Sequence, residues 1–209
     1  MNALIKDCVK LVVITLIAGL ALGVVYGITK DPIAAQNEKK QQEAYRQVFP
    51  DAESFEEVEG FSPEAASEVI KAYANPIDDH ANDEISSAVI ALDASGAPLG
   101  YIFTVTTGKG YGGDIQLTVG IQADGTVNGY SVLSIGETAG LGMKAKDDAD
   151  WASQYAGKKV EAFQVVKDGS GSADDSKIDA ISGATITSKA VTGAMNSCLA
   201  YFQSLEGGN

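Results

Sequence analysis

The sequence is poor in the residues that build metal and histidine-based catalytic sites. It has one histidine and two cysteines among 209 residues. His80 stands among acidic residues, and we interpret it as a solvated loop residue. Cys8 and Cys198 lack the spacing of zinc ligands, and we interpret both as small hydrophobic residues rather than functional thiols. We therefore expect no metal site and no catalytic residue of the chain's own.

Positive charge is also scarce. The chain has 15 Lys and Arg against 28 Asp and Glu, a formal net charge of -13. Such a field repels the phosphate backbone of nucleic acids, so we expect no nucleic-acid partner. The length suits one main folded unit with a short accessory segment.

One long apolar run is present. Residues 11–28 carry no charge, and as a helix they would extend about 27 Å, close to the hydrocarbon thickness of a bilayer. A cleaved signal peptide usually has an apolar region of about 7 to 15 residues followed by a small-residue cleavage site, which is absent here. A buried core helix would show an amphipathic pattern, which is also absent. These comparisons favour an uncleaved transmembrane anchor.

The basic residues around this run leave its orientation open. Lys6 and Lys10 precede it, whereas four basic residues follow it between positions 30 and 46. Counted alone, the second group would keep the C-terminal side in the cytoplasm. Charge counting therefore does not place the domain that follows.

The rest of the chain divides by composition. Residues 34–48 are rich in strong helix formers and predict a stalk helix that ends before Pro50. Residues 51–85 are acidic and contain a second helical candidate at 63–74. We predict three parts: a cytoplasmic tip and anchor at 1–30, a stalk and acidic connection at 31–85, and a folded domain at 86–209.

That domain contains an internal repeat. Residues 89–105 resemble residues 119–133, with Gly96, Gly100 and Tyr101 matching Gly125, Gly129 and Tyr130. Each copy is typical of a β-hairpin, and each leads into a glycine-rich loop, at 108–113 and 136–142. Apolar residues at helical spacing then predict a helix at 188–205 that packs on the sheet. The predicted fold class is α+β.

A hydroxyl-rich turn precedes the last helix. Residues 179–187 read Asp-Ala-Ile-Ser-Gly-Ala-Thr-Ile-Thr. Phosphate bound here would face the N–H groups at the start of a helix, where the dipole favours negative charge. Ser182, Thr185 and Thr187 are equally suited to act as simple helix N-caps. Local physics does not separate a cap from an attachment site.

The turn resembles the flavinylation motif of the FMN-binding domains in Rnf and Nqr respiratory complexes. In that family a separate transferase uses FAD to attach FMN by a phosphoester to the threonine of the Gly-Ala-Thr triplet, here Thr185. The loops at 108–113 and 136–142 resemble the family's other glycine loops, although Ala139 stands where the family usually has proline. The resemblance implies covalent FMN and a chain that needs no catalytic base.

The resemblance also implies an assembly and a location. The short anchored chain looks most like the G subunit of the Rnf ion-translocating ferredoxin:NAD oxidoreductase, and the Nqr C subunit is the similar but usually longer alternative. It implies a single-pass protein of the cytoplasmic membrane with the domain on the extracytoplasmic side, other membrane subunits as partners, and a redox role without an independent substrate-converting site. Other interpretations are a non-redox membrane-anchored binding module and a stand-alone flavoenzyme.

The implied cofactor contacts come from all three segments. Thr185 is the tether, and backbone N–H groups of the second glycine loop are candidates for the polar edge of the flavin. The expected contacts are Ser182, Gly183, Ala184, Thr185, Thr187, Glu137, Thr138, Gly140, Leu141, Gly142, Gly112 and Gly113.

Overall fold

The computed structural model describes residues 2–73, 80 and 82–207. The chain divides into two compact units, Met1–Gln42 and Glu43–Asn209. The first unit is part of helix α1 (Asn2–Val48). Within the described residues, this is the one helix long and apolar enough to cross a membrane, with a mean hydropathy of 2.5 over its most apolar window and none of that window buried. An apolar N-terminal helix, as predicted, fits a single-pass membrane anchor.

Helix α1 continues without a break from the apolar run into the predicted stalk, with Pro32 inside it. Its last residues, from Glu43 on, belong to the second unit. Phe49 donates its N–H to the carbonyl of Tyr45, and the side chain of Asn128 donates to the carbonyl of Val48 at 2.9 Å. The last carbonyls of a helix lack intrahelical partners, so Asn128 acts as a cap from a distant strand.

The second unit is built on a five-stranded antiparallel sheet in the order β1-β2-β3-β4-β5. The strands are β1 (Ser54–Glu57), β2 (Glu84–Leu92), β3 (Pro98–Thr107), β4 (Ile115–Gln122) and β5 (Val127–Ser134). The two repeated segments form the hairpins β2–β3 and β4–β5, so the predicted α+β fold with two hairpins is confirmed. Strand β1 was not predicted, because it has only four residues, of which two are charged and three are exposed.

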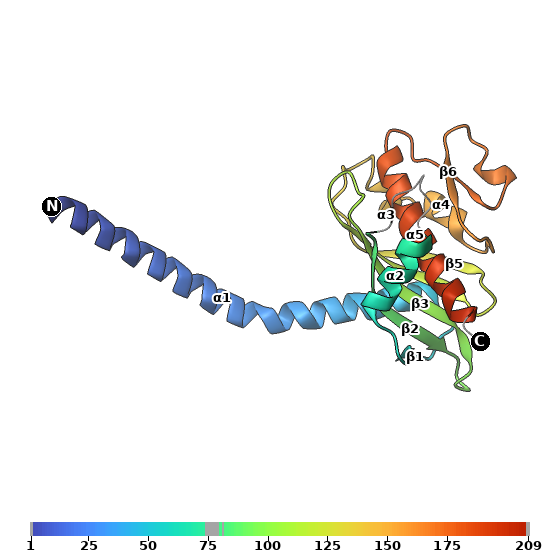
Figure 1. Cartoon of the computed structure of the whole chain (residues 1–209), viewed down its shortest axis with the longest axis horizontal. Helices are drawn as coiled ribbons and strands as arrows, with labels where there is room; N and C mark the ends of the chain where they lie inside the picture. The colour runs from blue at the N-terminus through green and yellow to red at the C-terminus, as the bar shows by residue number, and fades with distance from the viewer. Residues whose placement is uncertain (1, 74–79, 81, 208–209) are drawn as a thin grey trace. The chain divides into compact units, whose positions relative to one another are not determined.

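Two helices cover one face of this sheet (Figure 1). Helix α5 (Thr185–Glu206) packs on β3 and β4, and α2 (Pro63–Tyr73) packs on α5 and β2. Phe103, Leu117 and Met195 are fully buried in this layer. A smaller cluster on β2 and β3 buries Tyr45, Val48 and Phe49 with Ile102. Helix α5 begins three residues earlier than predicted, which places Thr185 in its first turn.

Residues 144–179 form short elements that the sequence did not reveal. They are α3 (Lys144–Asp147), α4 (Ala149–Ala152), the 3-10 turns η1 (Ser153–Tyr155) and η2 (Gly171–Ala173), and a parallel pair of strands, β6 (Gln164–Val166) and β7 (Lys177–Asp179). None is long enough to show a hydrophobic period. Long-range contacts hold them, such as the bond of 2.7 Å between the hydroxyls of Tyr155 and Thr192.

His80 is not a solvated loop residue, and that prediction is wrong. Only 13% of its side chain is exposed, and its Nδ1 lies 2.9 Å from the carboxylate of Asp83. Asp83 is buried and also accepts a bond of 3.0 Å from the hydroxyl of Ser197 on α5. The neighbouring charges suggested solvent, whereas tertiary packing brings α5 over this segment. Cys198 is buried beside it, and Cys8 is exposed on α1; both are free thiols.

Candidate functional site

A pocket of about 510 Å³ lies where the loops after β3 and β5 meet the start of α5. This volume is within the range of small-molecule sites, about 300 to 1,000 Å³. The three segments are the ones in which the sequence placed its motifs. The lining residues are Tyr111, Glu137, Thr138, Leu141, Gly142, Gly183, Ala184, Thr185, Ile186 and Thr187.

Most of the expected contact residues therefore meet at one place. Ser182, Gly140, Gly112 and Gly113 do not line the pocket, although each is close in sequence to a residue that does. Sequence reasoning missed Tyr111 and Ile186, which stand inside the recognised motifs but were passed over in favour of glycines and hydroxyls. The part played by each residue in cofactor binding stays a prediction.

Among the residues that the structure describes, no side chain caps the beginning of α5. Its N-cap residue is Ala184, with φ of -134° and ψ of 45°, and makes no side-chain hydrogen bond to the first turn. The N–H of Ser188 donates to the Ala184 carbonyl at 3.0 Å, which begins the helical bonding. The structure thus does not use Ser182, Thr185 or Thr187 as N-caps. Uncapped N–H groups at a helix start attract anions such as phosphate.

The two threonine hydroxyls of this turn remain available. Thr185 is half-buried and Thr187 is buried, and neither hydroxyl bonds to another residue of the part of the chain that the structure describes. Thr187 lies against the second glycine loop, since a Cβ placed on Gly142 would be 2.6 Å from its Oγ1. Both hydroxyls therefore border the pocket without competing protein partners.

In the second glycine loop, one of the expected backbone donors is already used. The Leu141 N–H donates to the carbonyl of Thr138 at 3.1 Å, as does the N–H of Met143. These bonds form a compact turn that leads into α3. The Leu141 side chain, which lines the pocket, is 43% exposed and is free to contact a ligand.

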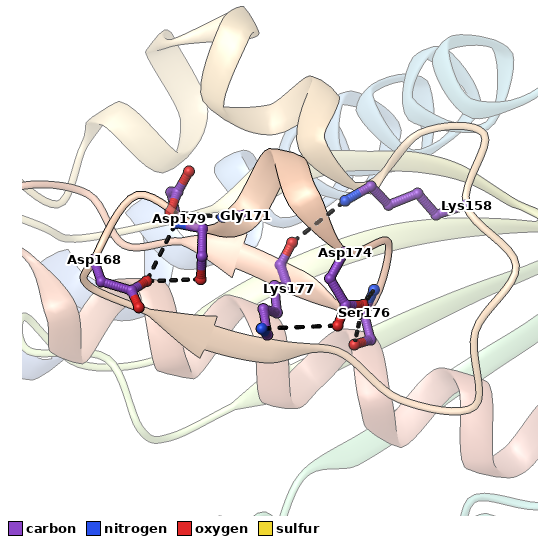
Figure 2. A network of polar contacts seen from close by, with 8 residues as sticks. Lys158, Asp168, Gly171, Asp174, Ser176, Lys177 and Asp179 are labelled. Carbon is purple, nitrogen blue, oxygen red and sulfur yellow. Dashed lines mark hydrogen bonds and ion pairs between the residues drawn. The ribbon is translucent and has the colours of Figure 1, made fainter.

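Asp179, the first residue of the motif, does not line the pocket and anchors the turn instead. Its carboxylate accepts the Gly171 N–H at 3.1 Å (Figure 2). Its backbone N–H donates to the side chain of Gln154 at 2.8 Å, and its carbonyl accepts from the indole of Trp151 at 2.7 Å. These contacts fix the end of β7, from which the turn to Thr185 starts.

The rim of the pocket is apolar. Within the described residues of the second unit, four large apolar residues are exposed, and three of them line this pocket: Tyr111 at 72%, Leu141 at 43% and Ile186 at 52%. Grouped exposed apolar side chains mark binding sites more often than scattered ones. The lining contains no Lys or Arg, so a bound anion would rely on the N–H groups of α5. The described residues contain no group of metal-binding side chains.

Comparison with known proteins identifies the family. Residues 110–200 match the family model described as an FMN-binding domain. The chain is 35% identical to the G subunit of the Na(+)-translocating ferredoxin:NAD(+) oxidoreductase complex of Acetobacterium woodii, over 93% of this chain and 89% of that protein. It is 32% identical to the G subunit of the proton-translocating ferredoxin:NAD(+) oxidoreductase complex of Clostridium ljungdahlii, over 99% of this chain and 96% of that protein.

A further relative and one solved structure complete the comparison. The G subunit of the ion-translocating oxidoreductase complex of Methanosarcina acetivorans is 31% identical over 97% of this chain and 96% of that protein. The crystal structure of Shewanella oneidensis NqrC covers 59% of this chain and 62% of its own, with a TM-score of 0.47 and 28% identity. Similarity to the three curated relatives spans nearly the whole chain, so this protein belongs to the family of G subunits of Rnf-type ion-translocating oxidoreductase complexes, with an FMN-binding domain.

Proposed function

We propose that this chain is an electron-carrying subunit with FMN attached covalently to Thr185 through its phosphate. It has no independent substrate-converting site in this proposal. The observation that carries it is the hydroxyl of Thr185, which has no protein partner in the described part and stands in the first turn of the uncapped helix α5 beside a pocket of about 510 Å³.

The residues present fit an FMN group in both charge and shape. The N–H groups of Thr185, Ile186 and Thr187 begin α5 without a side-chain cap and suit the phosphate. The rim residues Tyr111 and Leu141 offer apolar surface for a flat ring. When bound, FMN supplies the electron transfer, and the protein supplies orientation and a local field.

Attachment does not require chemistry by this chain. No histidine lines the pocket, and Glu137 directs one carboxylate oxygen to the backbone N–H groups of Tyr111 and Gly112. The resemblance to the flavinylated family implies a separate transferase that uses FAD. The Thr185 oxygen would take the FMN phosphoryl group from FAD, its proton would be lost, and AMP would leave.

The membrane arrangement is part of the same proposal. The chain crosses the cytoplasmic membrane once and holds the flavin domain on the extracytoplasmic side. There a covalent tether prevents loss of the cofactor by dilution, and the apolar rim permits close approach of a neighbouring carrier. The partners are other membrane subunits of an Rnf complex, which links ferredoxin to NAD and moves sodium ions or protons.

The test is the intact mass and visible spectrum of the denatured full chain, made together with a flavin transferase. We expect the natural chain to stay yellow and to gain the mass of one FMN less one water. Thr185→Ala should lose both signals, and Thr187→Ala should keep them as a control for a neighbouring hydroxyl. A colourless natural chain, or a flavin that stays bound in Thr185→Ala, contradicts the proposal.

A further inference from the structure

We infer that Glu137 is a positioning residue of this site: its carboxylate fastens the loop at 108–113 to the loop at 136–142 and so holds Tyr111 in the pocket wall. The expectation from the sequence was a contact between Glu137 and the flavin. Glu137 lines the pocket, so that contact stays a prediction. Its Oε1 also makes bonds within the protein, which shape the pocket before any ligand is present.

The hydrogen bonds carry this inference. Oε1 of Glu137 accepts the Tyr111 N–H at 2.7 Å and the Gly112 N–H at 3.2 Å. Tyr111 and Gly112 precede Glu137 in the sequence by 26 and 25 positions. The two bonds therefore join loops that follow different strands. Bonds to a carboxylate are stronger than those between neutral groups. Glu137 itself is only 8% exposed, which keeps water from competing for Oε1.

The glycines around Glu137 leave room for this bond and for little else. A Cβ on Gly110 would lie 2.9 Å from Oε1, and one on Gly142 would lie 2.5 Å from Oε2. A Cβ on Gly112 would collide with the carbonyl oxygen of Gly136. The two glycine-rich loops therefore pack directly on each other and on the carboxylate. Their composition reflects this packing as well as any approach of a ligand.

Tyr111 depends on this arrangement because its side chain has little support of its own. Tyr111 as a whole residue is 72% exposed although it lines the pocket. Its backbone N–H, held by Glu137, sets where the ring can reach. Without the Glu137 carboxylate, the loop at 108–113 would adopt other conformations, and the Tyr111 ring would move away from the pocket wall.

The consequence for the cofactor rests on the proposed function. With FMN on Thr185, Tyr111 would be the part of the pocket wall that meets the flavin ring. An aromatic ring in contact with a flavin would quench its fluorescence, so the fluorescence lifetime would report this contact without any turnover. In this arrangement Glu137 acts on the flavin through Tyr111, in addition to any contact that its own place in the pocket lining permits.

The first experiment needs no flavin. Hydrogen–deuterium exchange is measured on the full chain in detergent, made without transferase, for peptides that cover residues 108–113. Glu137→Ala should speed exchange of the Tyr111 and Gly112 amides by about tenfold or more, the effect of losing a bond to a charged group. Glu137→Gln, which keeps one accepting oxygen, should give a smaller rise. Asp114→Asn, which changes an exposed charge next to the same loop, should give none.

Two results would overturn the inference at this stage. One is unchanged exchange at 108–113 in both Glu137 variants. The other is a rise of equal size in the Asp114→Asn control. If Glu137→Ala raises exchange throughout the sheet, that variant has unfolded. The test of the inference is then Glu137→Gln, for which the rise in exchange should be confined to residues 108–113.

The second experiment uses flavin-loaded chain. Tyr111→Leu should lengthen the flavin fluorescence lifetime several-fold, Glu137→Gln should lengthen it less, and Tyr73→Leu, which alters another exposed tyrosine, should leave it unchanged. An unchanged fluorescence lifetime in Tyr111→Leu overturns the placement of the Tyr111 ring beside the flavin. It leaves the covalent attachment of FMN to Thr185 unaffected. Absence of flavin from the natural chain defeats the proposed function instead, and the exchange result is then judged separately.

Discussion

The hydroxyl of Ser188 joins the two ends of the turn that presents Thr185. It accepts the N–H of Ile181 at 2.9 Å and donates to the carbonyl of Ala184 at 3.0 Å. Ser188 is fully buried, and Ile181 and Ala184 are nearly so. Because these bonds close the turn from inside the helix, the N–H groups of the first turn remain open toward the pocket.

Removing this hydroxyl should loosen the attachment site. Ser188→Ala leaves the buried Ile181 N–H without its acceptor, and we expect the free energy of unfolding to fall by about 1 to 3 kcal/mol. Flavin attachment, followed by intact mass over time, should slow. Ser204→Ala removes a hydroxyl that bonds to the carbonyl of Tyr201 on the same helix, and it should leave attachment unchanged. Equal slowing in both variants would argue against a local role for Ser188.

Gly183 is required for its backbone conformation. Its φ is 78°, and a Cβ there would lie 3.2 Å from Cδ2 of Leu141. Gly183→Ala should lower the free energy of unfolding by about 1 to 2 kcal/mol, because left-handed φ is strained for alanine. It should also displace Leu141 and reduce flavin attachment. Gly169→Ala, at a φ of 76° in a loop outside the pocket, should lower stability by a similar amount and keep full flavin attachment. Full flavin attachment in Gly183→Ala as well would mean that the pocket tolerates the displacement of Leu141.

Thr118 offers a stabilising substitution. The Oγ1 atoms of Thr104 and Thr118, paired across β3 and β4, are buried without a hydrogen-bond partner within the described residues. Thr118→Val keeps the shape and removes the unpaired hydroxyl, so urea unfolding should show a gain of about 1 kcal/mol. Thr192→Val, which deletes a hydroxyl bonded to Tyr155 and to the Ser188 carbonyl, should destabilise. A loss of stability in Thr118→Val would mean that its hydroxyl is satisfied in solution.

Alkaline pH should destabilise the domain through Cys198. Burial, with the nearby charge of Asp83 second, raises the pKa of the Cys198 thiol well above its usual 9.0. The folded protein therefore keeps a proton that the unfolded chain releases. The contribution of the protonated Cys198 thiol to the free energy of unfolding is full below about pH 9 and falls as pH rises further. Burial likewise raises the pKa of the Tyr155 phenol above its usual 10.0, so the decline should steepen beyond that point.

The measurement is urea unfolding of the full chain in detergent between about pH 8 and pH 10. Cys198→Ala should flatten the decline in the free energy of unfolding, whatever its effect on the absolute value. Cys8→Ala, at the other free thiol, should leave the slope as it is. Equal slopes for the natural chain and Cys198→Ala would exclude the thiol as the titrating group.

Local patterns were enough for the larger elements. Alternation and turn glycines predicted the hairpins β2–β3 and β4–β5, and helical spacing predicted most of α5, because neighbours in sequence decide those structures. The same reasoning failed at His80, because α5, which buries it, lies more than 100 residues further along the chain. It also failed for β6 and β7, which are three residues each and form a two-stranded sheet with one another.

Local patterns are enough to specify the apolar helix, the order of hairpins and the motif around Thr185, since each rests on a local period or a short spacing. Three features became visible only in the folded chain: both glycine loops close on Glu137, Tyr111 and Ile186 border the pocket, and no side chain within the described residues caps α5. Those features depend on contacts between segments far apart in the chain. A pocket exists only after such segments are packed together, so no local pattern specifies its walls.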